Sequence, residues 1–210
     1  MPLWKPGLVG PAVRATDRLP PGQRLVTGWP VLHEGEVPPF DPAAFRFTVD
    51  GAVERPLSLS WEDVLALPPV AVTRDFHCVT TWSRYDNRWS GVSIAALLAR
   101  AQPRPEARFA LVRAWDDLGY TTNLPLADLD LPDNLLATHH DGAPLAPTHG
   151  GPLRLVVHHL YAWKSCKWVT GVTLLPEDQP GYWEERGYHS RGDPWAEERY
   201  AYQEGRGGRP

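Results

Sequence analysis

The chain is organised around Asp75-Phe76-His77-Cys78-Val79-Thr80-Thr81-Trp82-Ser83, which follows the alternating run Val70-Ala71-Val72-Thr73. The alternation predicts a strand, and the cysteine stands near its end. A thiolate is a strong nucleophile and a soft metal ligand, and either role requires a rigid position such as a strand end. Most free cysteines are small buried core residues, so Cys78 alone leaves a structural role open.

The composition is that of a globular protein. Its 210 residues, 42% hydrophobic and 22% charged, are enough for one large domain or two small ones. The chain is rich in tryptophan, with 10, and in proline, with 23; the prolines predict short elements and long, stiff loops rather than a helix bundle. A net charge of −4 gives no electrostatic case for binding nucleic acid.

The cysteine content and the apolar runs bear on the compartment. Cys78 and Cys166 are the two cysteines of the chain, and two distant thiols do not fit a secreted disulfide scaffold. The first residues lack the apolar core of a signal peptide and a twin arginine. No run approaches the ~20 apolar residues of a membrane span. We therefore expect a cytoplasmic protein without a membrane span.

The pattern of elements predicts an α+β fold in a single domain. Residues 1–24 are rich in Pro, Gly and Arg and are expected to form an extended arm. Residues 25–210 are expected to form one domain with an irregular C-terminal tail. Strands are expected at 45–49, 57–59, 70–73, 109–115, 120–123, 135–138, 152–157 and 167–175.

Short helices are expected between these strands, at residues 61–67 and 94–100. Ser60 and Asp63 form a start like a capping box for the first helix, and Ser93 is the expected N-cap of the second. No long helix separates consecutive strands, so the sheets are expected to be mixed and mainly antiparallel, with long loops between them.

A second informative stretch is Thr148-His149-Gly150-Gly151-Pro152-Leu153-Arg154, followed by Lys164-Ser165-Cys166-Lys167-Trp168. Paired glycines allow the backbone to approach a ligand closely. His149, Arg154, Lys164 and Lys167 concentrate positive charge in an acidic chain, which suits a phosphate. A solvated basic edge is the alternative interpretation.

These two stretches, in this order, resemble the core of the sulfite-oxidase-like molybdopterin oxidoreductases, and most closely their small subgroup without a haem domain. The resemblance extends from about Leu25 to Arg199. It implies the sulfite-oxidase-type molybdopterin-binding fold and a molybdenum-molybdopterin (pyranopterin dithiolene) cofactor. In this family the pyranopterin supplies two dithiolene sulfurs to molybdenum and the protein supplies one thiolate. That accounts for a metal protein without a Cys-x-x-Cys pair or a histidine cluster.

The resemblance also implies roles for individual residues. Cys78 matches the molybdenum ligand at the catalytic centre, and Cys166 matches a position without a ligand role. Thr80 and Trp82 are expected at the substrate face. The positions implied to contact the pterin or its phosphate are His33, Thr121, Thr122, His149, Arg154, Ser165 and Lys167.

The family chemistry implies oxygen-atom transfer on a small S- or N-oxide or an oxyanion. Electrons are expected to pass to or from a separate partner protein, because the chain has no haem, flavin or nicotinamide motif. Sulfite oxidases proper carry an arginine cluster shortly after the cysteine, where this chain has Thr80-Thr81-Trp82. A doubly charged anion needs concentrated positive charge, so the sequence favours a neutral or zwitterionic oxide over sulfite. Relatives that reduce methionine sulfoxide are exported, and the missing export signal argues against that particular substrate.

Three other functions are open on the residues alone. A hydrolase would use Cys78 as nucleophile and His139, His140 or His149 as base. A zinc protein would combine Cys78 with histidines, and the candidates are His77, His139, His140, His158 and His159. Adjacent histidines on a strand point to opposite faces, so His158 and His159 could not easily bind one ion together. A non-catalytic binding module would present its tryptophans as a surface patch.

Overall fold

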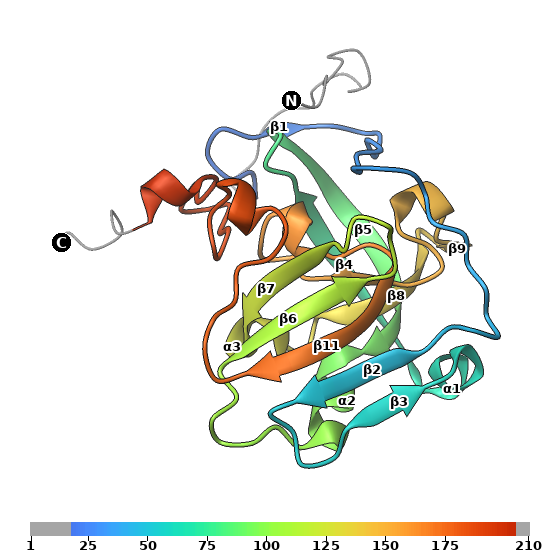
Figure 1. The fold of residues 1–210 in the computed structure, drawn as a ribbon. Coiled ribbons are helices and arrows are strands. Elements are labelled where there is room, and N and C mark those ends of the chain that lie inside the picture. The colour runs from blue at the N-terminus through green and yellow to red at the C-terminus, as the bar shows by residue number, and fades with distance from the viewer. Residues whose placement is uncertain (1–17, 205–210) are drawn as a thin grey trace.

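The computed structural model describes residues 18–204, so most of the arm expected at residues 1–24 lies outside the described part. Two β-sheets lie face to face (Figure 1). The described C-terminal segment lies beside the start of the described chain, where the guanidinium of Arg199 donates to the carbonyl of Pro21 at 3.4 Å. Both ends of the described chain therefore meet on one side of the molecule.

The six-stranded sheet carries the Cys78 segment. Its order is β1 (Arg24–Leu25), β5 (Trp82–Ser93), β8 (Leu135–His140) and β10 (Arg154–Val156), with β4 (Pro69–His77) paired to β5 and β9 (Ala143–Pro144) paired to β8. β1 runs parallel to β5, and the other pairs are antiparallel.

The five-stranded sheet contains strands from both halves of the chain. Its order is β3 (Leu57–Leu59), β2 (Phe47–Gly51), β11 (Val169–Leu175), β6 (Phe109–Ala114) and β7 (Thr121–Pro125). β11 runs parallel to β2 and antiparallel to β6. The expected α+β fold with mixed, mainly antiparallel sheets is confirmed.

The helices are short. They are α1 (Trp61–Ala66), α2 (Ile94–Ala101), α3 (Leu126–Leu129) and the 3₁₀ turns η1 (Pro147–His149), η2 (Ala162–Lys164), η3 (Glu184–Arg186) and η4 (Ala201–Gln203). The capping box at α1 is confirmed: the Ser60 hydroxyl accepts from the Asp63 amide at 3.1 Å, and the Asp63 carboxylate accepts from the Ser60 amide at 2.9 Å. Ser93 caps α2 by accepting from the Ala96 amide at 3.2 Å. None of the helices within residues 18–204 has the length and apolar character needed to cross a membrane.

The six-stranded sheet is buried on both faces where it crosses the middle of the molecule. Alternate residues of a strand point to opposite faces. In β10, Leu155 packs into the core shared with α2 and the five-stranded sheet, whereas Val156 packs with Phe76 and Trp89. The second, smaller core contains Cys78, so apolar packing supports the site from behind.

Strands β1, β5 and β9 were not among the expected elements. The twelve-residue strand β5 was not predicted, because Asp86 and Asn87 resemble a turn and Asp86 has a φ of 54°. A register shift between Arg74 and Phe76 absorbs this irregularity in β4. β1 covers residues 24 and 25, so strand pairing continues across the boundary expected between arm and domain.

Candidate active site

Cys78 lies in the turn of residues 78–81 that joins β4 to β5. Its amide donates to the Trp82 carbonyl at 2.9 Å, and its own carbonyl accepts from the Thr81 amide at 3.0 Å. Thr81 has a φ of 73°, a left-handed conformation that is strained for a β-branched residue, so its surroundings must hold the turn. The Thr80 hydroxyl donates to the Cys78 sulfur at 3.2 Å. Burial raises the pKa of the Cys78 thiol, and the hydrogen bond from Thr80 opposes this shift.

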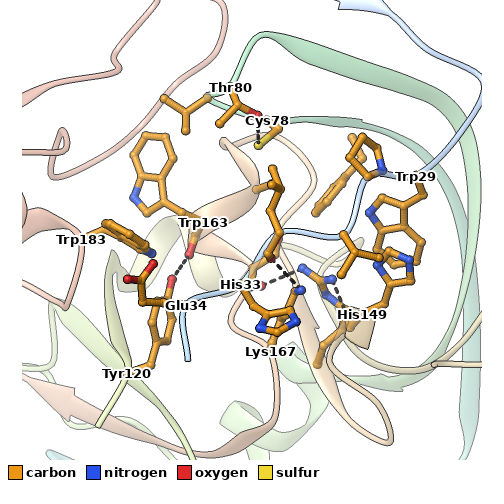
Figure 2. Close-up of a pocket in the computed structure, with 18 of the residues that line it drawn as sticks. Trp29, His33, Glu34, Cys78, Thr80, Tyr120, His149, Trp163, Lys167 and Trp183 are labelled. Atoms are coloured by element: carbon orange, nitrogen blue, oxygen red, sulfur yellow. Dashed lines mark hydrogen bonds between the residues drawn. The ribbon is translucent and has the colours of Figure 1, made fainter. Parts of the chain in front are cut away.

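Cys78 lines a cavity of about 390 Å³, a volume typical of sites for small molecules and cofactors. In Figure 2, Cys78 and Thr80 lie on one side of the cavity, and His33 and Lys167 lie on the opposite side. The lining contains all of the predicted site residues except Thr121 and Thr122: His33, Cys78, Thr80, Trp82, His149, Arg154, Ser165 and Lys167. The structure thus brings together residues that are far apart in the sequence.

Thr121 and Thr122 belong to β7 and are not among the residues that line this cavity. The Thr121 carbonyl accepts from the Tyr182 amide at 2.9 Å. The Thr122 hydroxyl is buried and donates to the Glu184 carboxylate at 3.4 Å. Both threonines therefore contact the C-terminal segment that packs on β7.

Arg154 is 2% exposed and holds two loops of the cavity wall. Its guanidinium donates to the carbonyl of His149 at 2.8 Å and to that of Ser165 at 2.9 Å. The rings of Trp29 and Phe76 lie 5.5 and 5.4 Å from its guanidinium carbon, within cation–π range. Burial lowers the pKa of Arg154 to about 10, so the side chain keeps its charge near neutral pH.

Lys167 joins the second motif to the segment that contains His33. Its ammonium donates to the carbonyls of Leu32 at 2.8 Å and Thr148 at 2.7 Å. An ammonium has three donors, so one has no acceptor within residues 18–204 and can serve a ligand. Burial, reinforced by Arg154, lowers the pKa of Lys167 to about 7. The exposed His33 ring lies edge-on to Trp168, with ring centroids 5.5 Å apart.

His149 stacks on Trp29, with ring centroids 3.7 Å apart and planes 10° from parallel. Burial, followed by the charges of Lys167 and Arg154, lowers the pKa of His149 to about 3, so its imidazole is neutral near pH 7. Its Nδ1 atom is buried without a hydrogen-bond partner within residues 18–204, as is the indole nitrogen of Trp82. Both atoms belong to residues that line the cavity, and a buried polar atom normally has a partner.

The paired glycines of the second motif are required by the protein's own packing. A Cβ at Gly151 would lie 2.1 Å from the Leu145 carbonyl, and one at Gly150 would lie 2.9 Å from the Lys167 side chain. Gly150 also has a φ of 97°, which favours glycine. Gly150 therefore allows the His149 loop to pack closely against Lys167, and Gly151 allows it to pack against the backbone of Leu145.

The aromatic lining was missed from the sequence. Trp29, Tyr120, Trp163, Trp183 and Tyr188 line the cavity but come from four separate segments without a common pattern. The Tyr120 hydroxyl donates to the Trp163 carbonyl at 2.6 Å. The high tryptophan content was the one signal in the sequence, and it was read as a possible surface patch.

Cys166 and Ser165 have different positions in the second motif. Cys166 is fully buried and is not among the cavity-lining residues. Its sulfur contacts the Lys167 carbonyl at 3.4 Å, and burial raises its pKa. Ser165 lines the cavity, and its hydroxyl accepts from the Val157 amide at 2.9 Å.

A family model, the oxidoreductase molybdopterin binding domain, matches residues 34–183. The chain belongs to this family. It is 46% identical over 188 residues to the uncharacterized oxidoreductase YuiH of Bacillus subtilis (strain 168), which covers 89% of this chain and 94% of YuiH. The protein is therefore an oxidoreductase of the sulfite-oxidase-like molybdopterin family, as the sequence predicted.

More distant relatives extend this comparison. The chain is 29% identical over 175 residues to the protein-methionine-sulfoxide reductase catalytic subunit MsrP of Campylobacter jejuni, covering 74% of this chain and 59% of that relative. The sulfane dehydrogenase SoxCD from Paracoccus pantotrophus superimposes with a TM-score of 0.61 at 23% identity, over 67% of this chain and 40% of that one. At that identity the structural match supports the fold alone.

The chemistry of the cavity fits a molybdopterin. A thiol lies on one side, where a single protein sulfur would complete a dithiolene-bound metal. Cationic and hydrogen-bonding side chains lie on the other, including the third donor of Lys167 and the Nδ1 atom of His149, neither of which has a partner in the described part of the chain. Together these groups suit a phosphate and a polar ring system.

The alternative functions find less support in the geometry. Within residues 18–204 no group of three or more His, Cys, Asp or Glu is arranged to hold a metal ion. His158 and His159 lie in a turn rather than on a strand. In the same part of the chain, the hydrogen bond to the Cys78 sulfur comes from Thr80, and no histidine bonds to it. A cysteine hydrolase would need such a base.

Proposed function

We propose that this oxidoreductase interconverts a small, neutral S- or N-oxide and its deoxygenated form by transfer of one oxygen atom. The reaction would take place at a molybdenum centre held by Cys78. Written in the reducing direction, a sulfoxide takes two electrons and two protons and becomes a sulfide and water. The electrons come from a separate protein, since the chain carries no motif for a second redox cofactor. The substrate and the partner go beyond what family membership establishes.

The proposed cofactor contacts are made by residues on opposite sides of the cavity. Cys78 would give its thiolate to the metal, with the Thr80 hydroxyl beside the sulfur. Lys167, His149 and Arg154 would hold the pterin and its phosphate, with His33 and Ser165 at the edges of the same surface. When bound, the molybdopterin supplies the two-electron oxygen-atom chemistry, and the chain supplies position, charge and exclusion of water.

The observation that carries the substrate assignment is the aromatic wall near Cys78. Trp82, Trp163 and Tyr188 line the cavity. Arg84 and Arg88, the arginines that follow the cysteine, do not line it. Arg84 binds Asp141 at 2.5 Å, and the Arg88 side chain is 70% exposed. An uncharged oxide loses less solvation in such surroundings than sulfite.

The relatives give independent support for an S-oxide. MsrP of Campylobacter jejuni is named a protein-methionine-sulfoxide reductase, and YedZ1 of Azospira oryzae, 28% identical over 156 residues, is named a putative subunit of one. The cytoplasmic location expected from the sequence remains a prediction, which fractionation of the source cells would test.

The test is a steady-state comparison on protein fully loaded with molybdenum. Reduction of dialkyl sulfoxides and amine oxides is measured with an artificial electron donor, and sulfite oxidation with an artificial acceptor. We expect an uncharged oxide to give the highest kcat/KM. A kcat/KM for sulfite that is higher by orders of magnitude would overturn the assignment.

A matched pair of variants ties the result to the aromatic wall. Trp163→Leu removes a ring that lines the cavity, whereas Trp195→Leu removes a ring that is 52% exposed and outside the lining. We expect Trp163→Leu to raise KM for an aryl sulfoxide more than for dimethyl sulfoxide. Trp195→Leu should leave both KM values unchanged. Equal effects of the two variants on KM would argue against a role of the aromatic wall in substrate binding.

A further inference from the structure

The turn that carries Cys78 is held by side chains from both ends of the described chain. The Gln23 side-chain amide donates to the Cys78 carbonyl at 3.1 Å. Its oxygen accepts from the Ser83 hydroxyl at 3.4 Å, and that hydroxyl lies 2.8 Å from Nδ1 of His77. Gln23 thus bonds to the Cys78 carbonyl in the turn and to the Ser83 hydroxyl in β5. Through that hydroxyl it is also linked to His77 in β4.

Arg199 holds the next carbonyl of the same turn. Its guanidinium donates to the Val79 carbonyl at 2.7 Å and to the Pro21 carbonyl at 3.4 Å. The side chain is 12% exposed and lies 3.7 Å from the Glu197 carboxylate. Its guanidinium carbon is 5.0 Å from the ring centre of Tyr161. Arg199 therefore joins the C-terminal segment, the start of the described chain and the turn.

Backbone contacts complete this arrangement. The Arg24 amide donates to the Thr81 carbonyl at 2.9 Å. A Cβ at Gly22 would lie 2.6 Å from the Glu197 carboxylate and 3.1 Å from the Arg199 guanidinium, so the two flanking segments are in close contact. Three of the four carbonyls in the turn of residues 78–81 accept hydrogen bonds from these flanking segments.

Such support matters because the turn is strained. Thr81 has a φ of 73°, and a β-branched residue keeps this conformation only when its surroundings hold it. The position of the Cys78 sulfur and the hydrogen bond from Thr80 both depend on the backbone of this turn. The family model matches residues 34–183, so Gln23 and Arg199 lie outside it on either side.

We propose that Gln23 and Arg199 are positioning residues that fix the Cys78 sulfur toward the cavity. The inference rests on the proposed function in taking Cys78 as the metal ligand, but the hold on the turn can be measured without the metal. The segments flanking the matched family region are thereby part of the active site: residues 29–33 and Tyr188 line the cavity itself, whereas Gln23 and Arg199 act on it through the Cys78 turn.

Amide hydrogen exchange on the full chain tests whether Gln23 and Arg199 stabilise the turn of residues 78–81. Gln23→Leu and Arg199→Met each remove one hydrogen bond to a carbonyl of the turn, those of Cys78 and Val79 respectively, and Arg199→Lys keeps the charge. We expect exchange in a peptide covering residues 78–83 to quicken on the order of tenfold in the first two variants, less in Arg199→Lys, and not at all in β10. The control is Arg191→Met in the same segment, whose side chain is 47% exposed and binds Asp128. Turn exchange equal to wild type in both Gln23→Leu and Arg199→Met would overturn the proposal.

A second readout reports on the sulfur itself. In molybdenum-loaded protein, Arg199→Met should shift the g-values of the Mo(V) electron paramagnetic resonance signal, and Arg191→Met should not. If turn exchange quickens while this signal stays the same, Gln23 and Arg199 support the fold alone and the positioning role is wrong.

The two proposals fail in different ways. If wild-type protein purifies without molybdenum, the proposed function is wrong, and alkylation of Cys78 by iodoacetamide then serves as the second readout. In a Cys166→Ala background, Gln23→Leu carries no change of charge and should raise the alkylation rate severalfold. An unchanged rate would overturn the positioning role.

Discussion

The buried ion pair between Lys164 and Glu184 should be one of the contacts of the cavity wall that are most costly to break by a single substitution. The Lys164 ammonium lies 2.6 Å from the Glu184 carboxylate, and the two side chains are 0% and 2% exposed. The same carboxylate accepts from the Trp163 indole at 2.8 Å. Removing one partner of a buried pair typically costs about 3–5 kcal/mol, because the other charge stays buried.

The structure refines this magnitude for each partner. In Glu184→Gln, the ammonium keeps acceptors on Asn123 at 2.7 and 2.9 Å and on Ser190 at 2.6 Å, so we expect a loss near 3 kcal/mol. In Lys164→Met the carboxylate keeps fewer donors, so the loss should be near 5 kcal/mol. At about 2–4 °C per kcal/mol for a chain of this size, Tm should fall by roughly 6–20 °C.

Urea unfolding of the two single variants and the double variant gives the coupling energy. We expect the double variant to lose less than the sum of the singles by about 1–3 kcal/mol. The control is Glu54→Gln, which breaks an exposed pair with Arg104 at side-chain exposures of 57% and 46% and should cost under about 1 kcal/mol. Additive losses, or a Glu184→Gln effect no larger than that of Glu54→Gln, would refute the reasoning.

Three further predictions concern the cofactor and pH. Lys167→Ala should lower the molybdenum retained after dialysis, and wild-type stoichiometry would contradict the proposed phosphate contact. Cys166→Ala should leave the metal content unchanged; loss of metal there would mean that the wrong thiol was chosen. Burial lowers the pKa of His149 to about 3 and of His158 to about 4, so below pH 6.5 the unfolded chain takes up protons that the folded chain does not. The free energy of unfolding should therefore fall as the pH is lowered from 6.5 to 4, by up to about 1.4 kcal/mol per pH unit for each histidine. Urea unfolding at a series of pH values measures this slope. A His158→Asn variant whose slope is as steep as that of wild type would contradict the prediction.

The sequence allowed prediction of the elements whose signals are local. Alternation predicted most of the strands, and a capping residue predicted the start of α1 at Ser60 and of α2 at Ser93. β5 was missed because its polar residues occupy both faces and Asp86 interrupts its geometry. Local patterns fail where a bulge or a positive φ breaks the periodicity.

The site residues divide in a similar way. Cys78, His149, Arg154 and Lys167 were predicted through a family resemblance, and the structure brings them to one cavity. Tyr188 and the other rings of the C-terminal segment come from a stretch without periodicity, so only the fold shows where they lie.

Contacts between residues that are far apart in the sequence were the hardest to predict. The contacts of Gln23 and Arg199 with the Cys78 turn span separations of 55 and 120 residues. No spacing rule connects positions so far apart. The sequence suggested only an arm and an irregular tail at these places.

X-ray absorption at the molybdenum edge tests the central claim most directly, because it counts the sulfur neighbours of the metal. Wild-type protein should contain molybdenum whose sulfur neighbours include one from Cys78. In whatever molybdenum the Cys78→Ser variant retains, the metal should have one sulfur neighbour fewer, since a serine oxygen is a harder ligand. A wild-type protein without molybdenum, or a Cys78→Ser spectrum identical to that of wild type, would contradict the account.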